Sequence, residues 1–212
     1  MNRFPLSNRT LGTLGIINAP FLLISMILIE RYPDLKKTAF DGLSGLIFML
    51  PWMGSLLGLI RLNATGSSAF GRWIIRINLV TLTLANFWNI YNAVEPWANT
   101  PLFWFLDAFW PISMLAMLLV GITVARVGVL SGWQRYVPLA VGLWLPFTAL
   151  AGELIGVILP AVAPLSAPHS MLYAMITSGV YAAVCWGLLA YIVRTTPQPL
   201  QVANALVSLQ SH

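Results

Sequence analysis

The sequence predicts an all-α integral membrane protein, a polytopic bundle of six transmembrane helices. Of the 212 residues, 58% are hydrophobic and only 8% are charged, whereas a typical soluble domain has about 25% charged residues. The mean hydropathy is +0.82. Apolar windows of about 20 residues, the length that crosses about 30 Å of hydrocarbon, recur along the chain. These observations together indicate a protein embedded in a lipid bilayer.

Six such windows are bounded by charges, prolines or polar turns. We expect transmembrane helices at Leu11 to Ile29, Phe40 to Ile60, Trp73 to Ala93, Leu102 to Val124, Val137 to Leu159 and Met171 to Val193. The windows and their short connections account for nearly the whole chain. We therefore expect a single six-helix domain over residues 1–194, followed by a short cytoplasmic tail at 195–212.

The first window follows two arginines, and positive charges before an apolar stretch are also typical of a signal peptide. Its apolar stretch of about 19 residues exceeds the usual 7 to 15, and no A-x-A cleavage site closes it. We therefore expect a retained helix. The second window opens with "TAFDGLSG", in which Asp41 is a candidate N-cap residue.

The third window carries a polar stripe. At 100° per residue, Asn78, Thr81, Asn89 and Asn92 fall on one face, whereas Arg72 and Arg76 point to the opposite side. In the fourth window, Pro111 is expected to kink the helix after Asp107. The fifth contains Glu153 within "GELIG", and the sixth contains the single cysteine, Cys185, expected to be a small buried hydrophobe.

Positive charge predicts the orientation of the bundle. Eight of the eleven Lys and Arg residues precede the first helix, follow the last or flank the second and fourth connections, and the other three lie in the first connection. By the positive-inside rule, both termini are cytoplasmic if the bilayer is a plasma or inner membrane. The net charge of +5 forms no basic cluster, so a nucleic-acid partner is not expected.

Residues 87–111 form a tryptophan-rich hairpin on the predicted outer side. They include four of the nine tryptophans and no Lys or Arg. One interpretation is an aromatic belt, because tryptophan favours the membrane interface. The other is a ligand platform in which Trp97, Trp104 and Trp110 form apolar walls.

The predicted topology brings several polar side chains to the outer half of the bundle. Glu153 is expected inside the bundle, because intramembrane acids normally face a partner or a cavity. The candidate ligand-binding residues are Asp41, Asn89, Asn92, Asp107, Glu153, His169 and Tyr173. The alternative is that these groups only join helices through hydrogen bonds.

Several chemistries are unsupported by the residues present. A retinal Schiff base needs a lysine within a membrane helix, and a dithiol redox centre needs a second cysteine. A metal site is not predicted, because the acids and His169 show no helical i, i+3 or i, i+4 spacing. No cofactor is indicated.

Three classes of function remain open. The first is the binding or transport of a small molecule or lipid through an outer-facing polar pocket. The second is a structural or accessory subunit of a larger membrane complex, and the third is a membrane-embedded enzyme that acts on an apolar substrate. The expected partners are the lipid bilayer, a small-molecule or lipid ligand, and other membrane proteins or further copies of the chain.

Overall fold

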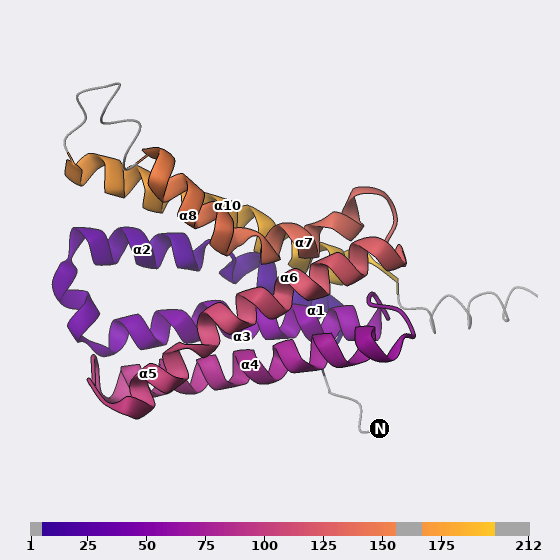
Figure 1. The fold of residues 1–212 in the computed structure, drawn as a ribbon, viewed down its shortest axis with the longest axis horizontal. Coiled ribbons are helices and arrows are strands. Elements are labelled where there is room, and N and C mark those ends of the chain that lie inside the picture. The colour runs from indigo at the N-terminus through magenta and orange to yellow at the C-terminus, as the bar shows by residue number, and fades with distance from the viewer. Residues whose placement is uncertain (1–5, 156–166, 198–212) are drawn as a thin grey trace, which may run out of the picture.

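The computed structural model describes residues 6–155 and 167–197, and all their regular structure is helical (Figure 1). The helices lie side by side along the longest axis. In chain order they are α1 (Asn8–Asn18), α2 (Phe21–Arg31), the 3-10 helix η1 (Pro33–Lys37), α3 (Ala39–Arg61), α4 (Ala69–Val94), α5 (Pro101–Asp107), α6 (Phe109–Val127), the 3-10 helix η2 (Gly132–Tyr136), α7 (Val137–Gly142), α8 (Trp144–Glu153) and α10 (Ala167–Thr195).

Four stretches of the described chain are long and apolar enough to cross a membrane. They are Asn8–Arg31, which combines α1 and α2, Ala39–Arg61, Pro101–Val127, which combines α5 and α6, and Leu172–Thr195. These stretches support an all-α membrane protein. The sequence predicted six crossing helices, two more than these four stretches support.

The other two predicted windows differ from these four for physical reasons. Helix α4 has 26 residues, but its two arginines and four asparagines lower its hydropathy. The fifth window is divided between α7 and α8, neither of which reaches membrane length, and its final residues lie outside the described chain. Six membrane crossings therefore remain a prediction.

Prolines account for the breaks within the predicted windows. Proline lacks an N–H, and its ring clashes with the carbonyl four residues earlier. Helix α5 ends at Asp107, four residues before Pro111, and α7 ends at Gly142, four residues before Pro146. A further break follows Asn18 at Pro20. The expected discontinuity near Pro111 is confirmed, but the first window is two helices rather than one.

Hydroxyl side chains cap four of the helices at their N-termini. Ser7, Thr38, Ser68 and Thr100 each accept a hydrogen bond from a backbone N–H of the first turn. The interpretation of Asp41 as the N-cap of α3 is wrong, because Thr38 occupies that position. Asp41 lies in the first turn, so its carboxylate is free to contact other helices.

Glycines of α1 and α3 allow these helices to approach α10 closely. A Cβ at Gly12 would lie 2.5 Å from the carbonyl oxygen of Ala190, so α1 packs directly against the backbone of α10. A Cβ at Gly58 would collide with the side chain of Val193. At Gly152 of the "GELIG" motif no described atom lies within 4 Å.

The start of α1 and the end of α10 lie together at one end of the bundle. A Cβ at Gly12 would touch Arg194, and Arg61 of α3 donates hydrogen bonds to the carbonyl of Leu6 at 2.7 Å and to Asn8 Oδ1 at 3.1 Å. We call this the terminal end, on the right in Figure 1. The distal end, on the left, holds the connections at 32–38 and 95–100.

Candidate functional site

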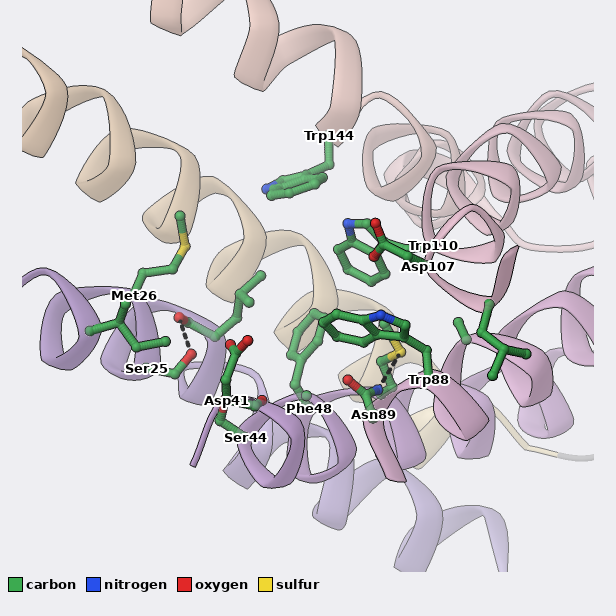
Figure 2. A pocket seen from close by; sticks show the side chains of 16 residues that line it. Ser25, Met26, Asp41, Ser44, Phe48, Trp88, Asn89, Asp107, Trp110 and Trp144 are labelled. Carbon is green, nitrogen blue, oxygen red and sulfur yellow. Dashed lines mark hydrogen bonds between the residues drawn. The ribbon is translucent and has the colours of Figure 1, made fainter. Parts of the chain in front are cut away.

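A cavity of about 330 Å³ lies within the bundle toward the distal end (Figure 2). Its walls come from α2, α3, α4, α5, α6 and α8. Two carboxylates, Asp41 and Asp107, line it together with the amide of Asn89 and the aromatic rings of Phe48, Trp88, Trp110 and Trp144. The remaining wall is largely apolar, so a few polar groups stand in an apolar site.

Helical periodicity places these residues on the cavity. On α3 the lining residues are Asp41, Ser44, Gly45, Phe48 and Met49, which follow the i, i+3, i+4, i+7, i+8 spacing of one helix face. Helix α2 contributes a face of the same period, with Leu22, Ser25, Met26 and Ile29. The cavity therefore lies between whole helix faces.

Asp41 is held by a neighbouring helix. Asn92 of α4 is completely buried, and its Nδ2 donates a hydrogen bond of 3.0 Å to Asp41 Oδ2. The Oδ1 atom of Asn92 accepts a hydrogen bond of 3.1 Å from the backbone N–H of Trp97. Asn92 thus orients the carboxylate from behind and does not line the cavity itself.

The asparagine stripe of α4 faces the interior as predicted. Asn78, Asn89 and Asn92 are buried, together with Thr81, whereas Arg72 and Arg76 are exposed. Three asparagine Nδ2 atoms point at methionine sulfurs: Asn89 lies 3.3 Å from Met49, Asn86 lies 3.2 Å from Met53 and Asn78 lies 3.4 Å from Met117. Within this stripe, only Asn89 reaches the cavity.

An aromatic cluster packs beside the cavity. Trp110 of α6 meets Trp144 of α8 and Trp52 of α3 at centroid distances of 5.8 and 6.2 Å, at steep interplanar angles of 67° and 89°. Trp186 of α10 joins the cluster 5.2 Å from Trp52 and 6.3 Å from Trp144. Edge-to-face packing of this kind is favourable between aromatic rings. It fixes two of the three tryptophans that line the cavity, Trp110 and Trp144.

Some tryptophans of the tryptophan-rich hairpin agree with the aromatic belt, and others agree with the ligand platform. Trp97 and Trp104 are 52% and 54% exposed, as expected of rings at a membrane interface. Trp73 and Trp133 are similarly exposed toward the terminal end. Trp110, in contrast, lines the cavity. Of the three predicted aromatic walls, the structure brings only this one to the cavity.

Two other predicted site residues, Glu153 and Tyr173, do not line the cavity. Glu153 is exposed at the end of α8, which contradicts its expected position inside the bundle, and Tyr173 is 47% exposed on α10. Neither is among the residues that line the cavity. His169 belongs to the first turn of α10, but its side chain lies outside the described part of the chain. The structure thus brings together Asp41, Asn89, Asp107 and Trp110.

Sequence reasoning missed Phe48, Trp88 and Trp144 as lining residues. The signal for Phe48 and Trp88 was periodicity rather than residue type, because Phe48 lies seven residues after Asp41 and Trp88 lies four residues before Asn92. Trp144 carried no such signal. Its place depends on hydrogen bonding from its Nε1 to the carbonyl of Ser178, 3.1 Å away on α10.

The cavity lining also includes hydroxyl groups. Ser44 reaches the cavity, but its hydroxyl donates to the carbonyl of Asp41 at 2.8 Å within its own helix. In the described residues, no three His, Cys, Asp or Glu side chains gather as a metal ion would require. Comparison of the chain with protein-family models, with curated proteins and with solved structures finds no match.

Proposed function

We propose that this protein binds or transports a small molecule or lipid in the cavity between α2, α3, α4, α5, α6 and α8. The observation that carries the proposal is the presence of two carboxylates in an apolar, partly open cavity within membrane-length helices. Ionised groups are costly within a bilayer and mark ligand or ion sites there. An interior made only for packing would have no need of them.

The size and lining of the cavity agree with a small ligand. Its volume of about 330 Å³ is at the lower end of the range of about 300–1,000 Å³ for ligand sites. Such sites combine apolar walls with a few polar groups that orient the ligand. Asp41, Asn89 and Asp107 supply those groups here.

Charge supports an orientation in which the cavity opens toward the outer half of a plasma or inner membrane. Arg61 and Arg194 lie at the terminal end, near the start of α1. The positive-inside rule makes that end cytoplasmic. In this orientation both termini are cytoplasmic and the ligand enters from the outer leaflet or the outer solution.

The cavity favours this function over the two competitors. An accessory subunit needs an apolar surface for its partner, which does not account for carboxylates inside the bundle. A membrane-embedded enzyme needs reacting groups within hydrogen-bond reach of one another. The Ser44 hydroxyl is instead engaged by its own backbone.

Filling the cavity tests the proposal. Ser25 of α2 is buried and lines the cavity, whereas the adjacent Ile24 is 45% exposed. The wild type, Ser25→Phe and the matched control Ile24→Phe would be purified, and their co-purified small molecules and lipids identified by mass spectrometry. We expect a near-stoichiometric species in the wild type and Ile24→Phe that is lost from Ser25→Phe. An unchanged profile in folded Ser25→Phe protein would refute the proposal.

A further inference from the structure

Two acidic side chains converge on one cavity from different helices. Asp41 enters from the first turn of α3 and Asp107 from the last residue of α5. Asn92 occupies one oxygen of Asp41. No hydrogen bond joins Asp107 to another residue drawn in Figure 2. Like charges that share a poorly solvated site destabilise each other, so a cation between them would be strongly favoured.

The described wall offers no cation of its own. No Lys, Arg or His is among the residues that line the cavity. Lys36 of η1 is exposed and attracts Asp41 from outside the cavity. A small divalent ion is a poor match, because Ca²⁺ takes six to eight oxygen ligands and Mg²⁺ takes six. An external cation that does not need a complete shell of oxygens therefore suits the two acidic side chains better.

The aromatic rings indicate what kind of cation fits. Phe48, Trp88, Trp110 and Trp144 line the same cavity as the two acids (Figure 2). Phe48 and Trp110 meet at 71°, and Trp110 and Trp144 at 67°, so these rings are steeply inclined to one another rather than stacked in parallel. The faces of tryptophan and phenylalanine attract cations, and aromatic cages recognise substituted ammonium groups.

Resting on the proposed function, we propose that the ligand carries an ammonium group, either a substituted amine or a quaternary ammonium. The cation lies between the carboxylates of Asp41 and Asp107 and the tryptophan rings. Leu22, Met26 and Ile29 of α2 contact the attached apolar part. Such a group occurs in a choline-type lipid headgroup and in free organic amines.

The test compares a cation with its neutral isostere. The full chain is reconstituted in phosphatidylglycerol nanodiscs, which contain no ammonium lipid, and titrated by calorimetry with choline and with 3,3-dimethyl-1-butanol. The alcohol has the same shape but carbon in place of the charged nitrogen. We expect saturable choline binding that is at least about tenfold tighter than binding of the alcohol.

Matched variants locate the binding in the cavity. Asp107→Asn and Asp41→Asn each remove one cavity charge, and Glu95→Gln removes an exposed charge at the same end. We expect each Asp variant to weaken choline binding by about tenfold or more, and Glu95→Gln to change it by less than about twofold. Trp110→Leu should weaken it likewise, whereas exposed Trp104→Leu should not. Gel filtration and circular dichroism verify that each variant is folded. If one Asp variant does not fold, the other still tests the proposal.

The outcomes separate this inference from the proposed function. Equal binding of choline and the alcohol, insensitive to both Asp variants, would overturn the ammonium assignment. The ammonium assignment would also be overturned if choline did not bind while the Ser25→Phe variant still lost a co-purified molecule. In both of these cases the proposed function stands. No binding together with an unchanged Ser25→Phe profile would overturn both. Competition from added phosphatidylcholine would identify a lipid headgroup as the source, and its absence a free amine.

Discussion

Asn92 of α4 and Asp41 of α3 are joined by a hydrogen bond of 3.0 Å from Nδ2 to Oδ2. The Oδ1 atom of the same amide accepts a hydrogen bond from the backbone N–H of Trp97. The φ of Trp97, 58°, is unusual for a residue other than glycine. One buried side chain therefore orients a cavity carboxylate and holds the turn after α4. Both features depend on a residue that does not touch the cavity.

Replacing this residue should destabilise the fold. We expect Asn92→Ala to lower the free energy of unfolding by about 1–3 kcal/mol, because it leaves a partly buried carboxylate and a backbone N–H without their partner. Thr83→Ala is the control, since Thr83 is exposed on the same helix and bonds only to Leu79 of its own helix. Thermal unfolding followed by tryptophan fluorescence measures both. Equal melting temperatures for the two variants would contradict the prediction.

The methionine sulfurs opposite the asparagine stripe should contribute measurable stability. Met117→Leu preserves side-chain volume but removes the described acceptor of Asn78 Nδ2. We expect a loss of about 1 kcal/mol relative to Met114→Leu. Met114 is a buried methionine of the same helix. Adding Asn78→Leu to Met117→Leu should recover part of the lost stability. The free energies of unfolding of the three variants are measured by chemical denaturation in detergent. If the double variant recovers no stability, the effect of Met117→Leu is steric and does not depend on the hydrogen bond.

Glycine substitutions should have opposite signs at two positions. A Cβ at Gly42 would collide with the backbone of Asn89 and Ala93 on α4, so Gly42→Ala should destabilise the protein by about 1–3 kcal/mol. At Gly152 there is open space around the helix in the described chain, so Gly152→Ala should stabilise it by about 0.5–1 kcal/mol. An unchanged or raised melting temperature for Gly42→Ala would argue against this packing of α3 on α4.

Arg61 should anchor the beginning of α1. Arg61→Ala removes hydrogen bonds to the Leu6 carbonyl and to Asn8 Oδ1, so the segment before α1 loses its attachment to α3. We expect faster amide hydrogen exchange over residues 7–12, with a global cost of only about 1 kcal/mol. Arg76→Ala is the matched control, because Arg76 is exposed and its described contact is with the ring of Trp73. Exchange that is equally fast in both variants would refute the anchor.

Orientation is testable by cysteine labelling, because Cys185 is buried and should react slowly. We expect Asn99→Cys, at the distal end, to react with a membrane-impermeant maleimide in intact cells. Ser67→Cys, in the connection between α3 and α4 at the terminal end, should react only after the cells are opened. The reverse pattern would invert the topology.

The class of the protein and the burial of the α4 stripe follow from the sequence alone. Hydropathy, window length and the spacing of Asn78, Thr81, Asn89 and Asn92 are local properties, and they correctly predicted apolar helices with an inward polar face. Proline chemistry likewise predicted the discontinuity near Pro111. None of these inferences requires knowing which helix lies beside which.

Only the tertiary structure decided which polar groups meet. The sequence placed Asp41, Asp107 and Glu153 alike in the outer half of the predicted bundle, as candidate ligand-binding acids. The first two line the cavity, whereas Glu153 is exposed at the end of α8. Depth along a helix can be read from the chain, but the direction of a side chain also depends on how each helix is rotated and which neighbour it packs against. Close contacts such as Gly12 against α10 and Gly42 against α4 set those rotations, and they join residues far apart in the sequence.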